Sequence, residues 1–242
     1  MVVVSYIPIT TEAQRTHRLH REESSILNNT ASQREFLPAA GRDVFLPLYD
    51  PLVSLMGFGR AAEDLIDEAN IERGHSVLDL GCGTGTLILM LRRRYTGVVV
   101  IGLDPDAKVL QRASNKFKRA GMSVQLDLGF SDQLPYEEKS FDRVFSSFMF
   151  HHLDEQERER TAREVSRVLK PTGTFHLLDF VADPAKDGFW DRLIESHALM
   201  KTNTDERLLE LIGRAGFTSV TKVKEGSMLF GLMRTSYFRA SV

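Results

Sequence analysis

The stretch Val77-Leu78-Asp79-Leu80-Gly81-Cys82-Gly83-Thr84-Gly85-Thr86 decides the fold of this chain. A short apolar run ends in three glycines at alternate positions, and apolar residues at helical spacing follow. Because glycine lacks a Cβ atom, it allows a tight turn and lets a ligand approach the main chain. The stretch therefore predicts a buried strand, a glycine-rich turn and a helix. Such a turn either holds a ligand or only connects the strand to the helix.

Apolar strand patterns alternate with helical patterns on both sides of this turn. A helix with Ala62, Leu65 and Ile66 on its apolar face should end at Gly74, before a strand over 76–80. Further strands are predicted over 97–103, 124–128, 141–148, 174–180, 217–224 and 228–239. The other predicted helices end at Gly121, run from the N-cap Asp154 to Leu169, and lie near 187–200 and 205–215. This alternation implies an α/β fold, in which helices cover both faces of a mainly parallel sheet.

The composition of the 242 residues excludes several classes of protein. With 42% hydrophobic and 26% charged residues, the chain is neither collagen-like nor largely disordered. Its net charge of −2 is too small for the positive field that favours nonspecific binding of nucleic acid or anionic membranes. The single cysteine, Cys82, forms no disulfide within the chain, and no apolar run approaches the roughly 18 residues of a membrane span. We expect a cytoplasmic protein without a secretion signal.

The N-terminal part differs in character from the rest of the chain. Residues 1–44 are mostly polar, and we expect an arm that is helical or mobile, followed by one domain over 45–242. Two prolines interrupt the apolar and aromatic segment 45–58, which excludes a continuous helix there. This segment is a candidate lid over the ligand. Tyr49 in the lid either faces the ligand, as a catalytic side chain would, or only packs on the domain.

The acidic residue Asp104 indicates what the turn holds. It ends the second strand roughly 20 residues after Gly85, where a carboxylate can accept hydrogen bonds from both hydroxyls of a ribose. The glycines follow the pattern Gly-x-Gly-x-Gly, and the Asp79 carboxylate beside them would repel a pyrophosphate. A nucleoside with an ammonium group and no phosphate fits better, and S-adenosylmethionine (SAM) is the common one. A nicotinamide-dependent oxidoreductase is a rival hypothesis that this spacing disfavours.

The chain also resembles the class I SAM-dependent methyltransferases, in particular the small-molecule group that includes ubiquinone and menaquinone C-methyltransferases. The matching blocks are Tyr49-Asp50, Val77 to Gly85, Gly102-Leu103-Asp104-Pro105, Leu134-Pro135-Tyr136, Ser140-Phe141-Asp142, His151-His152-Leu153, Val168 to Gly173 and Ala215-Gly216-Phe217. The resemblance implies a Rossmann-like, doubly wound sheet of seven strands in the order 3-2-1-4-5-7-6. It also implies methyl transfer from SAM to a small-molecule acceptor, with S-adenosylhomocysteine as the product.

The resemblance further implies which residues bind the cofactor: Asp79, Gly81, Cys82, Gly83, Gly85, Asp104, Pro105, Phe130, Ser131, Asp132, Ser147 and Phe148. The glycines would line the methionine part with Asp79 near its amino group, and Asp104 would hold the ribose hydroxyls. Pro105 and the loop at 130–132 would border the adenine. Many relatives carry a polar residue, often Asp, where this chain has Phe130, so Asp132 is a possible substitute. Ser147 and Phe148 would approach the methionine end.

The reaction that the resemblance implies is a one-step displacement that needs neither a metal nor a covalent intermediate. A neutral hydroxyl or amine acceptor can still need a base, and His151 and His152 follow the fourth strand at the expected mouth of the pocket. His151 is the preferred candidate. The alternative is that one histidine caps the helix that starts near Asp154 and that the other is simply exposed.

Several neighbouring functions are disfavoured. Enzymes that methylate amines of nucleic-acid bases resemble one another in an Asn/Asp-Pro-Pro-aromatic block, where this chain reads Ser147-Phe148-Met149-Phe150. Enzymes that methylate cytosine carbon or arsenite use cysteines beyond the glycine turn, and this chain has none. A SAM-binding sensor or scaffold without catalysis is the alternative to an enzyme. The sequence leaves carbon, oxygen and nitrogen acceptors open, and it does not indicate the oligomeric state.

Overall fold

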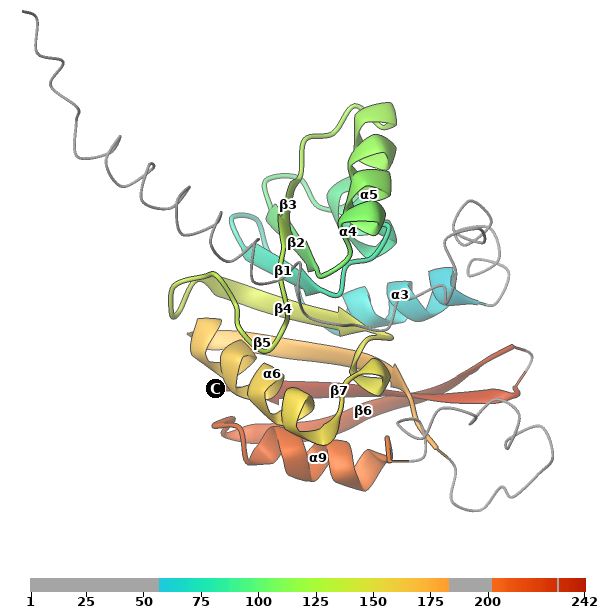
Figure 1. Ribbon diagram of the computed structural model, residues 1–242, viewed down its shortest axis with the longest axis vertical. Helices are drawn as coiled ribbons and strands as arrows, with labels where there is room; N and C mark the ends of the chain where they lie inside the picture. The colour runs from blue at the N-terminus through green and yellow to red at the C-terminus, as the bar shows by residue number, and fades with distance from the viewer. Residues whose placement is uncertain (1–56, 183–201, 230) are drawn as a thin grey trace, which may run out of the picture. The chain divides into compact units, whose positions relative to one another are not determined.

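A seven-stranded sheet in the order β3-β2-β1-β4-β5-β7-β6 forms the centre of the computed structural model (Figure 1). The structure describes residues 57–182, 202–229 and 231–242, which all belong to the unit Phe36–Val242. The strands are β1 (Ser76–Leu80), β2 (Val99–Asp104), β3 (Gln125–Leu128), β4 (Phe141–Ser147), β5 (Leu169–Phe180), β6 (Ser219–Met228) and β7 (Met233–Ser241). Pairs among β1 to β5 are parallel, and β7 is antiparallel to both β5 and β6. The predicted fold class and strand order are confirmed.

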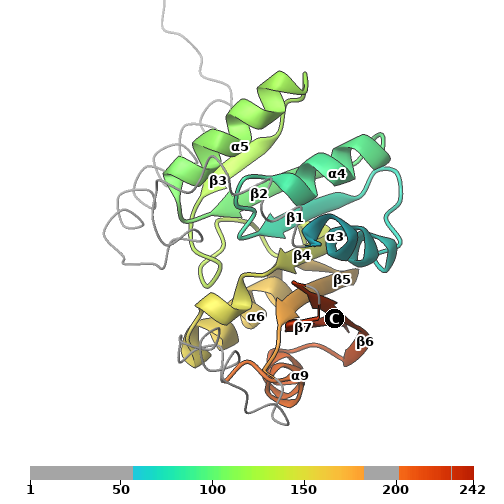
Figure 2. The same ribbon diagram turned by 90° about the vertical axis from the view of Figure 1, so that its right-hand side faces the viewer.

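Helices cover both faces of the sheet (Figure 2). The helices are α3 (Phe58–Asp67), α4 (Thr86–Arg94), α5 (Ala107–Arg119), α6 (Glu155–Val168) and α9 (Asp205–Gly213), with a 3₁₀ turn η2 (Phe150–His152). α3, α4 and α5 share one apolar cluster with Val77 of β1, whereas α6 and α9 share the other with Leu78 and Leu80. Successive residues of β1 thus point to opposite faces, as expected for a strand that is buried on both sides.

Two helices follow the sequence pattern closely. The four apolar residues that predict α5 (Val109, Leu110, Ala113 and Phe117) are all buried. The predicted N-cap Asp154 accepts a hydrogen bond from the backbone N–H of Glu157 (2.7 Å), and the Glu157 carboxylate accepts one from the backbone N–H of Asp154 (3.0 Å). This reciprocal capping box fixes the start of α6 directly after η2.

Some predicted boundaries are wrong. The helix before β1 ends at Asp67, not at Gly74, which instead adopts φ +89° and donates its backbone N–H to Gly97 at the turn into β1. β5 starts at Leu169 rather than near residue 174, because Leu169 already pairs with Phe141 across a bulge. The β6–β7 hairpin turns after Met228, a few residues later than predicted.

Other predictions fall on residues outside the described ranges. They are the arm over 1–44, the candidate lid over 45–58 apart from its last two residues, its Tyr49, and the helix near 187–200. Within the described ranges, no helix is long and apolar enough to cross a lipid bilayer.

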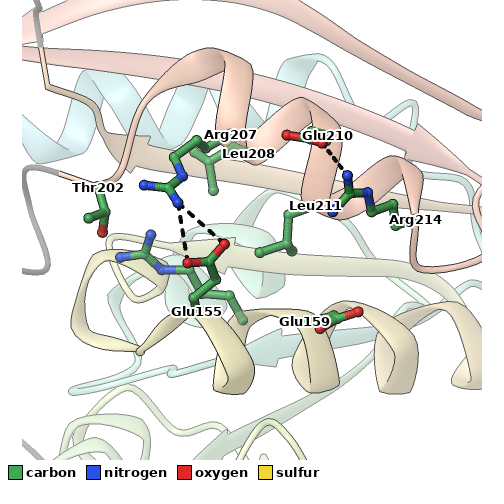
Figure 3. A pocket seen from close by; sticks show the side chains of 9 residues that line it. Glu155, Glu159, Thr202, Arg207, Leu208, Glu210, Leu211 and Arg214 are labelled. Carbon is green, nitrogen blue, oxygen red and sulfur yellow. Dashed lines mark hydrogen bonds and ion pairs between the residues drawn. The ribbon is translucent and has the colours of Figure 1, made fainter.

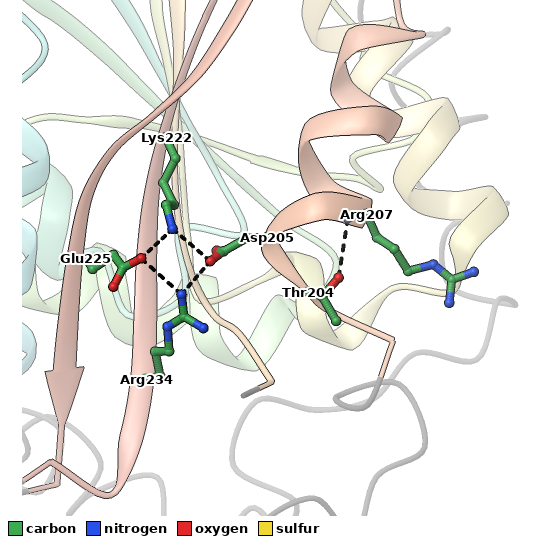
Figure 4. Close-up of polar contacts among 6 residues, drawn as sticks. All are labelled: Thr204, Asp205, Arg207, Lys222, Glu225 and Arg234. Carbon is green, nitrogen blue, oxygen red and sulfur yellow. Dashed lines mark hydrogen bonds and ion pairs between the residues drawn. The ribbon is translucent and has the colours of Figure 1, made fainter. Parts of the chain in front are cut away.

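Four charged side chains join the start of α9 to the two antiparallel strands (Figure 4). Lys222 and Arg234 both donate to Asp205 Oδ2, at 3.0 and 2.6 Å, and both also contact Glu225. Asp205 is buried, so the two cations offset the cost of placing its charge away from water. The cluster therefore fixes α9 against β6 and β7.

The Asp154→Ala variant should lower the free energy of unfolding by about 1 kcal/mol, because α6 loses the side-chain acceptor of its capping box. Urea unfolding followed by circular dichroism measures this change. The Asp154→Asn variant keeps an acceptor oxygen, so its stability should be close to that of the wild type. Equal losses in the two variants would contradict the role assigned to the cap.

Candidate cofactor and acceptor site

The glycine turn between β1 and α4 has a backbone that few other residues adopt. Gly81, Gly83 and Gly85 have φ values of +65°, +53° and +74°. The backbone N–H groups of Gly81 and Cys82 both donate to the Leu103 carbonyl, at 2.8 and 3.1 Å. The turn is therefore bonded to the carboxyl end of β2, the neighbouring strand.

The three glycines have different surroundings. A Cβ atom on Gly81 would lie 2.5 Å from Met149 Cγ, and one on Gly85 would lie 2.4 Å from Phe117 Cζ. A Cβ atom on Gly83 would have only the Gly81 carbonyl oxygen near it, at 4.0 Å. Gly81 and Gly85 are thus required by packing inside the protein, whereas Gly83 borders open space that a ligand can occupy.

Asp104, the last residue of β2, is bonded to this turn. Its Oδ2 accepts a hydrogen bond from the backbone N–H of Gly83 (2.9 Å), and its Oδ1 accepts one from the backbone N–H of Asp106 (2.9 Å). Burial raises the pKa of the Asp104 carboxyl to about 6, although the two backbone donors oppose this shift. Asp104, the residue predicted to bind the ribose, therefore lies next to the glycine turn in the structure.

Asp79, unlike Asp104, is buried without hydrogen-bond donors to its carboxylate among the described residues. Its side chain is 1% exposed, and neither carboxylate oxygen has a hydrogen-bond partner among the described residues. Burial, and then the nearby Asp104 charge, raise the pKa of the Asp79 carboxyl well above its usual range. Buried carboxylates normally have donors or a counter-charge, so these two oxygens indicate a missing cationic partner.

Cys82 has a packing role in the structure. The Gly102 position, across from Asp79 in the parallel register of β1 and β2, has no room for a Cβ atom, which would lie 2.8 Å from Cys82 Sγ. Burial, followed by the charges of Asp79 and Asp104, raises the pKa of the Cys82 thiol well above its usual value. The thiol therefore fills space beneath the turn in its neutral form.

The predicted adenine-side residues lie after two strands: Pro105 follows β2, and Phe130, Ser131 and Asp132 lie in the loop after β3, which bonds to α6. Ser131 Oγ hydrogen-bonds to Thr161 Oγ1 (2.9 Å), and Asp132 accepts a hydrogen bond from Arg160 Nε (3.0 Å). Pro105 and Phe130 are partly buried. Ser131 and Asp132 thus anchor this loop, and adenine contact by any of the four residues stays a prediction.

The methionine-side candidates lie at the end of β4. Ser147 is its last residue, and Phe148 follows with φ +54° while its backbone N–H donates to the Leu178 carbonyl (2.8 Å). The Phe148 ring contacts the rings of Phe180 and Phe58, with centroids 4.5 and 5.6 Å away. Phe148 therefore forms part of an aromatic wall beside the turn, and its contact with a cofactor stays a prediction.

His151 has a partner that the sequence reasoning missed. Its Nδ1 lies 2.5 Å from Asp179 Oδ1, and its backbone N–H donates to Asp179 Oδ2 (2.9 Å). The Asp179 side chain is fully buried near the carboxyl end of β5. A single acid in the apolar run Phe175 to Phe180 was the signal that could have identified it, since Asp104 ends its own apolar strand in the same way.

A separate hollow lies between α6 and α9 (Figure 3). It is lined by Glu155, Arg158, Glu159, Thr202, Arg207, Leu208, Glu210, Leu211 and Arg214. Arg207 pairs with Glu155 across it at 3.3 Å, and Arg214 pairs with Glu210 along α9. None of the predicted site residues lines this hollow. Among the described residues no group of three His, Cys, Asp or Glu side chains has a metal-binding arrangement.

The variants Gly85→Ala and Gly83→Ala should differ sharply. Gly85→Ala places a methyl group into the buried Phe117 ring at a positive φ, so the free energy of unfolding should fall by about 2–4 kcal/mol. Gly83→Ala adds only the backbone strain, about 1–2 kcal/mol, but its methyl group enters the open space. Urea unfolding measures the stabilities, and calorimetry with SAM measures affinity. Strong SAM binding by folded Gly83→Ala would contradict this assignment.

Asp79→Asn should make the ligand-free protein more stable relative to wild type as the pH rises. The folded-state pKa of Asp79 is raised, so its carboxyl costs stability above the ordinary Asp value, and this cost grows as the pH rises toward the raised pKa. Asn carries no such cost. Urea unfolding at about pH 5 and about pH 8 gives the difference between the two proteins.

Asp142→Asn is a control, because the pKa of Asp142 is shifted in the opposite direction to that of Asp79. Burial tends to raise the Asp142 pKa, but the bonds from Lys170 and from the Ser76 backbone N–H outweigh burial and lower it. Its contribution to stability is present above the ordinary Asp pKa and is lost as the pH falls through the lowered value. Asp142→Asn should therefore lose stability at about pH 8. The same sign of change in both variants would contradict the electrostatic assignment.

Comparison with known proteins agrees with this geometry. A family model described as "Methyltransferase domain" matches residues 77–173, which run from β1 into β5. An uncharacterized methyltransferase of Synechocystis sp. is 35% identical over 162 residues, 65% of this chain and 73% of that protein. A demethylmenaquinone methyltransferase of Thermus thermophilus is 35% identical over 144 residues, 57% of this chain and 63% of that protein. Another match, from Streptomyces halstedii, extends over 51% of the relative's length.

A solved structure has the same fold. The geranyl diphosphate C-methyltransferase of Streptomyces coelicolor, in complex with Mg²⁺, geranyl diphosphate and S-adenosylhomocysteine, aligns with a TM-score of 0.64 at 15% identity. The alignment covers 76% of this chain and 77% of that one. The strand order, the glycine turn with Asp104 and the sequence relatives lead to one conclusion: this chain belongs to the class I SAM-dependent methyltransferases.

Proposed function

We propose that the protein transfers a methyl group from SAM to a small-molecule acceptor by direct in-line displacement. The observation that carries this proposal is the buried Asp79 carboxylate, whose two oxygens have no hydrogen-bond partner among the described residues and lie close to a glycine turn with open space at Gly83. The ammonium group of a methionine moiety would supply the missing counter-charge. Bound SAM would supply a methyl group that is already activated by its sulfonium centre.

The roles of the other cofactor-side residues follow from their positions. The backbone of the glycine turn would approach the methionine part at Gly83, which borders open space, while Gly81 and Gly85 would keep the turn in shape. Asp104 still has lone pairs beyond the two that its backbone donors use, so it can accept the ribose hydroxyls. Pro105 and residues 130–132 would border the adenine, and Ser147 and Phe148 the methionine end.

On the acceptor side, His151 is the proposed base. Its side chain is 11% exposed, and its Nδ1 is held by Asp179, so Nε2 is the nitrogen that is left for a substrate. Tyr49 keeps its proposed role in a lid, which lies outside the described residues. We further propose that the enzyme works in the cytoplasm, needs no metal and does not act on nucleic acid, in line with its single cysteine and near-neutral charge.

The alternative of a SAM-binding sensor or scaffold has less support. The named relatives are methyltransferases, and the His151–Asp179 pair is an arrangement suited to proton transfer rather than to binding alone. Release of S-adenosylhomocysteine in the presence of a metabolite extract separates the two functions. A sensor would bind SAM without releasing that product.

Titration calorimetry with SAM tests the cofactor site. The wild type should bind SAM, and Asp104→Ala should bind it about 100-fold more weakly, because two hydrogen bonds from the ribose to a charged acceptor are lost. Asp142→Asn is the matched control, since this acid lies at the opposite end of the parallel strands, paired with Lys170. Its affinity should equal that of the wild type. Undiminished binding by Asp104→Ala would refute the ribose assignment.

A further inference from the structure

Both oxygens of the buried Asp179 side chain have hydrogen-bond partners. Oδ1 lies 2.5 Å from His151 Nδ1 and accepts from the backbone N–H of Phe180 (2.7 Å), while Oδ2 accepts from the backbone N–H of His151 (2.9 Å). Two backbone N–H donors and one imidazole nitrogen thus converge on one fully buried side chain.

A buried cation, Arg158, also interacts electrostatically with Asp179. Arg158 of α6 is 4% exposed and donates from Nε to the Phe150 carbonyl (2.9 Å). Burial lowers the pKa of its guanidinium, and the charge of Asp179 opposes that shift, so the two groups interact. Asp179 therefore interacts both with His151 of η2 and with Arg158 of α6.

This arrangement decides which nitrogen of His151 carries the proton. An ionised carboxylate only accepts hydrogen bonds, so Nδ1 must be the donor, and a neutral imidazole then has its lone pair on Nε2. Among the described residues, the adjacent His152 ring also contacts His151, with its centroid 4.0 Å away. Nε2 is consequently oriented as a proton acceptor before any substrate binds.

Met149 links the 3₁₀ turn that carries His151 to the glycine turn, and aromatic rings pack beside His151. The Met149 side chain packs against Gly81, and the Met149 carbonyl accepts from the backbone N–H of His152, so η2 is directly attached to the cofactor side. The Phe180 ring meets His151 edge-on at 5.4 Å and continues into the wall formed by Phe148 and Phe58. These rings favour an apolar, ring-bearing molecule.

We infer that the methyl acceptor is a hydroxyl group on an apolar, ring-bearing molecule, that His151 removes its proton, and that Asp179 is the positioning residue. This inference rests on the proposed function. A neutral amine already carries a free nucleophilic lone pair, whereas a neutral hydroxyl is a weak nucleophile until its proton leaves. An oriented imidazole base is therefore more useful for a hydroxyl acceptor than for an amine acceptor.

The step balances in atoms and charge. The acceptor O–H bond breaks and its proton moves to His151 Nε2, while the oxygen lone pair forms the bond to the methyl carbon. The carbon–sulfur bond breaks, and its electron pair stays on sulfur, which becomes a neutral thioether. Asp179 stays ionised and stabilises the imidazolium, as carboxylates do in comparable histidine pairs. The imidazolium then releases its proton to water.

A purely structural role for Asp179 would consist of holding the backbone of η2. The Asp179→Asn variant separates the two roles, because its amide oxygen can still accept from the His151 backbone N–H. Its amide group cannot compensate Arg158 and favours the tautomer with the proton on Nε2. Nitrogen-15 NMR of histidine-labelled protein reads the tautomer directly, with His151→Gln to assign the signal. We expect Nδ1–H in the wild type and a shift toward Nε2–H in Asp179→Asn.

Turnover is measured with SAM labelled with ¹³C in the methyl group and a mixed metabolite extract enriched in phenols and ring-bearing alcohols. The label should appear as an O-methyl group, which its ¹³C chemical shift distinguishes from N- and C-methyl groups. Asp179→Asn and His151→Gln should lose about 100-fold or more of the turnover rate, with SAM affinity unchanged in calorimetry. His152→Gln is the matched control and should keep its activity.

The outcomes separate this inference from the proposed function. Failure of the wild type to bind SAM would overturn the proposed function and the inference with it. SAM binding with labelled N- or C-methyl products, or with no methylated hydroxyl, would overturn the inference alone. So would an Nε2–H tautomer in the wild type, or near wild-type turnover by Asp179→Asn.

Discussion

The structure depends on one electrostatic constraint: two carboxyl groups, Asp79 and Asp104, are buried next to each other at the carboxyl ends of neighbouring parallel strands. Removing an acid from water is costly, and the proximity of a second acid adds to the cost. Asp104 is compensated by two backbone donors, but Asp79 is not compensated by any described group. The charged form of Asp79 is therefore unfavourable in the ligand-free protein, and a positively charged ligand would stabilise it.

The surrounding fold serves to keep these acids in place. Gly102, opposite Asp79 in the strand register, leaves room for the Cys82 side chain, and the Leu103 carbonyl bonds two residues of the glycine turn. Both acids thus lie on strands that are fixed by their neighbours, and rigid elements hold functional groups more accurately than loops do. On the next pair of parallel strands, the end of β4 and the end of β5 bring His151 and Asp179 together in the same way.

The sequence was sufficient for features that depend on local chemistry. The glycine turn, the apolar stripe of α5 and the Asp154 cap each follow from a few neighbouring residues, and all appear as predicted. Gly74 misled the prediction because a glycine with positive φ serves a turn as well as a helix end. The pairing of His151 with Asp179 joins residues 28 apart in the sequence, so only the strand register reveals it. Which part of SAM contacts residues 130–132 likewise depends on packing that no local pattern encodes.

Hydrogen bonds and ion pairs anchor the chain on either side of residues 183–201, and this has a consequence for the length of that segment. The backbone N–H of Ala182 donates to the Asn203 carbonyl (2.9 Å), the Asn203 amide donates to the Phe180 carbonyl (2.5 Å), and the charged cluster at Asp205 holds the chain that follows. The two described residues on either side of this segment, Ala182 and Asn203, are thus bonded to each other next to Phe180. Doubling the length of a segment closed in this way costs only about 0.6 kcal/mol. The length of the chain between these anchors can therefore change with little loss of folding stability.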